Sequence, residues 1–179
     1  MLAAIWQGPV IRLIPVGMIL LALQRSLFVE ITVAGVIVQV VLALAAAAGA
    51  AGGSERGATT GFVLGIMYDL VEGLPVGSTA IPMTIAGIVA GSLAIIVADP
   101  QWWLGMIFTT LGAAVGEVMV PVTRLFTGAA DPFEPRLTLI VPVVAIAAGI
   151  LSPLFIPLAR WCLRIKRSEW VAPPRDAEI

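Results

Sequence analysis

A small or acidic residue recurs at every fourth position through one apolar stretch of this chain. The series consists of Gly57, Gly61, Gly65, Asp69, Gly73 and Gly77. Because residues four apart lie on neighbouring turns of one helix face, the first three glycines predict a groove without side chains. Such a groove allows a second helix to approach to backbone contact, as helices do in lipid. The second helix belongs either to this chain or to a partner, and the charged Asp69 that follows the three glycines favours the partner.

The composition is that of an integral membrane protein. Of the 179 residues, 60% are hydrophobic and 12% are charged, whereas a soluble domain carries about 25% charged residues. The net charge of −1 provides no basic surface for nucleic acid. There is no histidine and a single cysteine, Cys162, which argues against histidine-based metal sites, Cys–His nucleophilic pairs and internal disulfides. No phosphate loop or Ser/His/Asp set is present either, so we expect a protein without catalysis, metal or other cofactor.

Six segments have the length and apolarity, or nearly so, to cross the hydrocarbon core, which requires about 20 residues. We expect them at residues 9–23, 31–51, 57–71, 78–97, 101–123 and 137–158. A re-entrant pair is the alternative to two full spans within residues 57–97. The sequence therefore predicts an all-α membrane protein, with a six-helix transmembrane domain over residues 1–160 and a basic cytoplasmic tail over residues 161–179.

The distribution of basic residues predicts the orientation, because lysine and arginine near the ends of spans favour the cytoplasm. With six spans, seven of the ten lie on the side of both termini: Arg12, Arg56, Arg160, Arg164, Lys166, Arg167 and Arg175. Only Arg25, Arg124 and Arg136 lie on the opposite side. We therefore expect both termini in the cytoplasm.

Two acids lie deep within the expected spans, where a carboxylate is costly unless it is protonated, paired or hydrated. At about 1.5 Å per residue, Asp69 lies about 18 Å and Glu117 about 24 Å along their helices, so both fall in the outer half. The alternatives for both are an ion pair with Arg25 or Arg124, a hydrogen-bonded structural carboxyl, a proton or cation site, and a polar socket for a partner. The role of Glu117 stays open.

The position of Asp69 favours a structural role. The break at residues 73–75 begins one helical turn after it. We expect its carboxyl to stabilise that corner by accepting hydrogen bonds from backbone or hydroxyl groups, such as those of Ser78 and Thr79, or by pairing with an arginine.

The run GFVLGIMYDLVEGLPVG at positions 61–77 resembles the signature of the MreD family of rod shape-determining membrane proteins. In that family the pattern covers the third helix and the turn into the fourth. The matching residues are Gly61, Gly65, Asp69, Gly73, Pro75 and Gly77. The resemblance implies a six-helix bundle similar to the S-components of energy-coupling-factor vitamin transporters.

The resemblance also implies a function and a location. It implies a scaffold in the bacterial cytoplasmic (inner) membrane that binds MreC and helps to organise peptidoglycan synthesis and cell shape. Further implied partners are MreB, RodZ, the polymerase RodA, a class B penicillin-binding protein and membrane lipids.

The alternative function is a small-molecule-binding membrane subunit of an energy-coupling-factor-type transporter. Such a site needs convergent polar and aromatic groups. The expected outer loops offer few of them besides Glu72, Phe133 and Glu134. The sequence therefore favours the scaffold.

Overall fold

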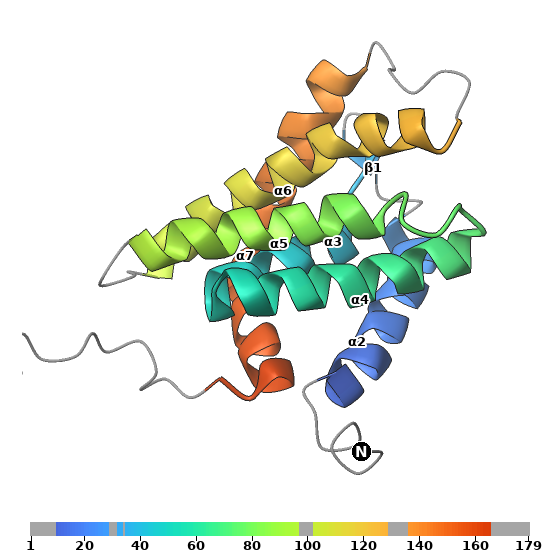
Figure 1. Cartoon of the computed structure of the whole chain (residues 1–179). Helices are drawn as coiled ribbons and strands as arrows, with labels where there is room; N and C mark the ends of the chain where they lie inside the picture. The colour runs from blue at the N-terminus through green and yellow to red at the C-terminus, as the bar shows by residue number, and fades with distance from the viewer. Residues whose placement is uncertain (1–9, 29–31, 34, 97–101, 129–135, 166–179) are drawn as a thin grey trace, which may run out of the picture.

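The computed structural model describes residues 10–28, 32–33, 35–96, 102–128 and 136–165. These residues contain six α-helices, which confirms the predicted all-α class and the number of helices (Figure 1). The helices are α2 (Val10–Leu23), α3 (Val40–Gly52), α4 (Ser54–Glu72), α5 (Ala80–Ile96), α6 (Trp102–Phe126) and α7 (Leu137–Leu163). A π-helical turn, η1 (Gln24–Phe28), extends α2.

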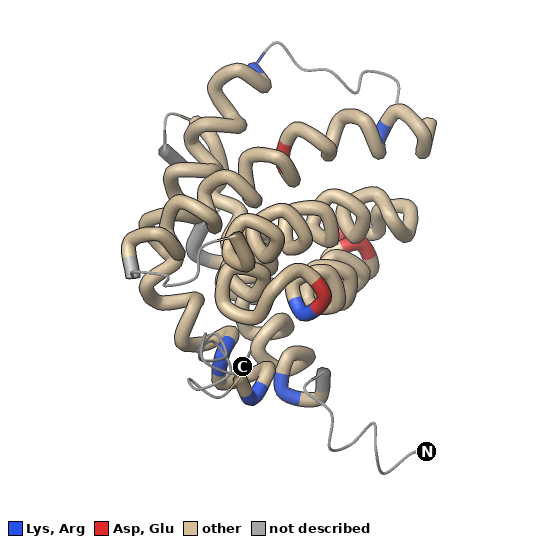
Figure 2. Tube along the Cα trace, turned by 60° about the vertical axis from the view of Figure 1, so that its left-hand side comes forward, with Lys and Arg blue, Asp and Glu red and all other residues tan. Residues whose placement is uncertain are grey.

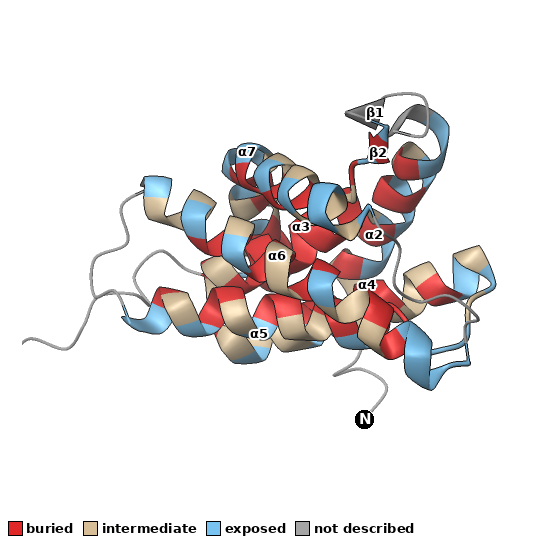
Figure 3. Ribbon diagram, turned by 90° about the horizontal axis from the view of Figure 1, so that it is seen from above, coloured by how far each residue is buried: buried red, intermediate tan, exposed pale blue. Residues whose placement is uncertain are grey.

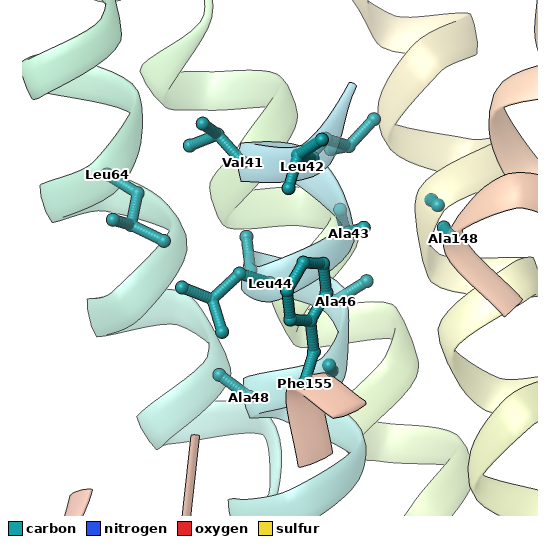
Figure 4. Packing of buried hydrophobic residues seen from close by; sticks show 14 of the residues in the cluster. Val41, Leu42, Ala43, Leu44, Ala46, Ala48, Leu64, Ala148 and Phe155 are labelled. Atoms are coloured by element: carbon teal, nitrogen blue, oxygen red, sulfur yellow. The ribbon is translucent and has the colours of Figure 1, made fainter. Parts of the chain in front are cut away.

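Helix α3 is the centre of the bundle. Its sequence, VVLALAAAAGAAG, is made of small and aliphatic residues, and eleven of its thirteen residues are buried (Figure 3). Leu64 of α4 and Phe155 of α7 lie against it from two sides (Figure 4). Alanine and glycine allow neighbouring helices to approach closely, so the other helices surround α3 with little space between them.

The expected span over residues 31–51 is wrong over its first nine residues, because α3 begins only at Val40. The residues before it form a short antiparallel hairpin, β1 (Thr32–Val33) and β2 (Val36–Ile37). Gly35 has a φ of +77° in the turn, a conformation that glycine adopts without steric cost. Apolarity alone predicted one long helix here, although β-branched residues on both sides of a glycine favour a hairpin.

Within the described residues, two helices are long and apolar enough to cross a membrane, over Trp103–Phe126 in α6 and Leu137–Leu163 in α7. Helices α3 and α5 are apolar but shorter. The thirteen residues of α3 extend about 20 Å, less than the roughly 30 Å of a hydrocarbon core.

The start of α2 and the end of α7 lie at the same end of the bundle (Figure 1). The Arg12 guanidinium lies 5.1 Å from the centroid of the Trp161 ring, and Nη1 donates a hydrogen bond of 3.4 Å to the Trp161 carbonyl. Basic positions gather where these two helices meet (Figure 2). Because α7 continues to Leu163, Trp161 and the buried Cys162 belong to the bundle rather than to the predicted tail. The tail from Lys166 onward, and the loop with Phe133 and Glu134, lie outside the described residues.

Candidate functional site

The glycine groove of α4 is filled by α5. Gly57, Gly61 and Gly65 are buried, and a methyl group on any of them would lie closer than 3.0 Å to backbone atoms of α5. The α5 residues that it would meet are Gly87, Met83 and Ala80, respectively. The predicted tight helix contact is therefore confirmed. The expectation that these glycines receive a partner's helix is wrong, because the chain's own α5 occupies the groove.

Helix α3 joins the same contact. A methyl group on Gly49 of α3 would meet the backbone of Gly87, and one on Gly57 would lie 2.6 Å from the Gly49 Cα. Three backbones therefore meet at three glycines. Contacts this close exclude any side chain at these positions, so the glycines determine how α3, α4 and α5 pack.

The carboxyl group of Asp69 is fully buried and accepts hydrogen bonds from five donors. Oδ2 accepts from the backbone N–H groups of Gly77 at 2.8 Å and Ala80 at 3.4 Å. Oδ1 accepts from the Ser78 hydroxyl at 3.0 Å, from the Thr79 N–H at 3.0 Å and from the Thr79 hydroxyl at 2.5 Å. Of the two alternatives for this residue, the described part of the chain has the hydrogen bonds and no arginine paired with Asp69.

These bonds join two helices through one residue. The Asp69 carboxylate accepts hydrogen bonds from the N–H groups of Gly77 and Thr79, which precede α5, and from that of Ala80, its first residue. At the end of α4, the N–H of Gly73 donates to the Asp69 carbonyl. Gly73 and Gly77 have φ values of +68° and +104°, which non-glycine residues rarely adopt. The Ser78 N–H donates to the carbonyl of Pro75 within the same turn.

The six signature residues therefore form one structural corner. Gly61 and Gly65 permit the contact of α4 with α5, while Asp69 and the turn residues define the connection between them. The helix ends at Glu72, next to the predicted break at residues 73–75. Gly73 and Gly77 thus act as turn residues and do not extend the groove.

The arginine near this corner pairs with another acid. Nε of Arg25 lies 3.1 Å from Oε1 of Glu72, on the partly exposed end of α4. Exposed pairs of this kind contribute about 0–1 kcal/mol, so this ion pair is a minor feature.

Glu117 of α6 is buried, with 4% of its surface exposed. One of its two carboxyl oxygens has a hydrogen-bond partner among the described residues. Oε1 accepts a hydrogen bond of 3.2 Å from the side-chain amide of Gln39, which precedes α3. Oε2 is buried and has no hydrogen-bond partner among the described residues. A buried carboxylate oxygen without a donor costs free energy, so it calls for a ligand, a water molecule or a proton.

Glu117 and Gln39 line a cavity of about 680 Å³ between β2 and the facing ends of α6 and α7. Arg124 of α6 and Arg136 at the beginning of α7 also line it. A smaller hollow of about 180 Å³ shares Gln39 and Arg124 with the cavity and adds Tyr68. Polar side chains from distant segments thus converge at the end of the bundle opposite Arg12.

No pattern in the sequence predicted this cavity. Its four polar side chains are at positions 39, 117, 124 and 136, which no local motif connects. One available signal was Gln39, an amide in the middle of the apolar run over residues 31–51. A polar side chain in such a run marks a position that faces other polar groups or water.

Comparisons of the chain with protein-family models, with curated proteins and with solved structures gave no significant match.

Proposed function

We propose that this chain is a non-catalytic, multi-pass scaffold of the bacterial cytoplasmic membrane that binds MreC within the peptidoglycan elongation complex. The main support is that the residues of the MreD-like signature form one corner in three dimensions, from the glycine contact to the Asp69 cap. A chance match to the pattern would not require its residues to cooperate in this way. In this proposal, all six helices cross or enter the bilayer and both termini are cytoplasmic.

The filled groove changes the expected mode of assembly. Because α5 covers Gly57, Gly61 and Gly65, the transmembrane helix of MreC contacts another face of the bundle. The signature residues then act on assembly indirectly, by giving the bundle the shape that the partner recognises.

Affinity purification of the full chain from a native membrane in mild detergent tests this function. Recovery of MreC, identified by mass spectrometry, is the expected result. Recovery of an energy-coupling ATPase pair in its place would contradict the scaffold.

A second candidate function is a solute-binding membrane subunit, and the cavity is the observation that favours it. Its volume of about 680 Å³ falls within the roughly 300–1,000 Å³ of small-molecule sites, and few convergent polar groups are typical of such sites. The sequence had offered no such cluster. A water-soluble vitamin that raises the melting temperature of the purified chain would support this candidate over the scaffold.

A further inference from the structure

We propose that the cavity between α6 and α7 binds the headgroup of an anionic phospholipid, with an acyl chain in the adjoining apolar groove. The ligand is a phosphodiester whose headgroup carries a hydrogen-bond donor, as phosphatidylglycerol does. This inference depends on α6 and α7 crossing a membrane and does not depend on the identity of any protein partner.

The charges of the cavity fit one phosphodiester. Arg124 and Arg136 both line it, and neither forms an ion pair within 4.0 Å in the part of the chain that the structure describes. The two guanidinium groups supply the positive charge that one phosphodiester requires. Guanidinium groups bind phosphate oxygens through two parallel N–H donors, which makes arginine well suited to this ligand.

The unsatisfied oxygen of Glu117 specifies the rest of the headgroup. Glu117 lines a cavity that is otherwise cationic, and its buried Oε2 has no hydrogen-bond partner among the described residues. A hydroxyl group of a glycerol headgroup supplies a donor within reach of the phosphate. A headgroup without a donor would leave Oε2 without a hydrogen bond, and would therefore bind less tightly.

A second hollow, of about 480 Å³, lies beside the cavity and is almost entirely apolar. Pro121 and Leu137 line both of them, so the two hollows adjoin across the contact of α6 with α7. Val118, Val122 and Val141 line the apolar one. Both helices are long and apolar enough to cross a membrane, and in that arrangement lipid acyl chains would contact this groove. The combination of a charged cavity and an apolar groove fits an amphipathic ligand better than a soluble one.

Native mass spectrometry of the full chain, released from nanodiscs of defined composition, measures the lipid that remains bound. Phosphatidylglycerol is compared with phosphatidylcholine, which lacks net charge, and with phosphatidylmethanol, which has the same charge but no headgroup donor. We expect phosphatidylglycerol to be retained over phosphatidylcholine by about tenfold or more, the size expected for a charge-assisted hydrogen bond.

The variants separate the contributions. Arg124→Gln and Arg136→Gln should each lower retention of phosphatidylglycerol about tenfold, whereas Arg160→Gln, at the other end of α7, should not. Glu117→Leu should abolish the preference for phosphatidylglycerol over phosphatidylmethanol. Val118→Trp should fill the groove and reduce retention, while the matched Leu154→Trp, on an exposed face of α7, should leave it unchanged.

Several outcomes would overturn this proposal. One is equal retention of all three lipids, or equal effects of the cavity and control variants. Displacement of the lipid by soluble glycerol 3-phosphate would assign the site to a soluble phosphate ester. Leu139 lines the cavity, so a photo-crosslinker can be placed there. If it captures a polypeptide in cells and no lipid, the cavity belongs to a protein segment. Because the lipid assay contains no partner protein, its failure would leave the scaffold proposal intact.

Discussion

Replacing Asp69 by asparagine or by leucine tests whether this buried carboxyl is structural or carries protons. In the native corner it accepts from three backbone N–H groups and two hydroxyl groups. Asparagine keeps one carbonyl oxygen, which retains the three bonds to Oδ1 if its amide nitrogen takes the place of Oδ2. The amide then faces the N–H groups of Gly77 and Ala80, and both lose their acceptor.

The two variants should therefore differ in stability. Since a buried donor without an acceptor costs about 1–3 kcal/mol, and the bond to Ala80 is long, asparagine should destabilise by roughly 2–3 kcal/mol. Leucine removes the acceptors of all three N–H groups, which should cost roughly 5 kcal/mol or more. That loss is comparable with the whole stability of about 5–15 kcal/mol of a typical domain. The leucine variant should thus fail to form the native bundle, while asparagine remains folded.

Thermal unfolding of the detergent-solubilised chain, together with cell shape at matched membrane levels, measures both effects. Glu72→Gln is the control, because it removes a carboxylate one turn further along α4 whose exposed ion pair contributes about 0–1 kcal/mol. The structural role would be refuted if both variants had the melting temperature of the native protein and lost function equally. That result would indicate proton transfer, since neither side chain can exchange a proton.

Two further predictions concern packing and topology. Gly65→Leu places a side chain against the backbone of α5 and should lower the free energy of unfolding by at least the roughly 1–3 kcal/mol of an overpacked core. A lower melting temperature measures this loss. Gly105→Leu is the control and should cost less, because the added side chain meets the flexible end of an isoleucine side chain. In a Cys162→Ser background, a cysteine at exposed Val76 should react with an impermeant thiol reagent added outside intact cells, while one at Glu55 should react only after permeabilisation. Labelling of both from the same side would exclude the six-span topology.

The sequence by itself determined the class of the protein and most of its local structure. The hydropathy of a segment is the sum over its own residues, so the apolar runs predicted the helices. The breaks at glycine and proline predicted the helix ends to within a few residues. The exceptions are residues 31–39 and the last turn of α7. The hydrogen bonds of Asp69 with Ser78 and Thr79 were also predictable. Donors and acceptor lie within eleven residues, so the turn itself brings them together.

The tertiary structure alone decided what fills the glycine groove and where a ligand could bind. A spacing of four determines which face of a helix is smooth, but it contains no information about which helix covers that face. In the packed bundle, α5 covers the glycine face of α4. The cavity required Gln39, Glu117, Arg124 and Arg136 to come from the segment before α3, from α6 and from α7. Side chains separated by up to about a hundred positions converge only when the helices pack, and that packing depends on the shapes of all the faces together.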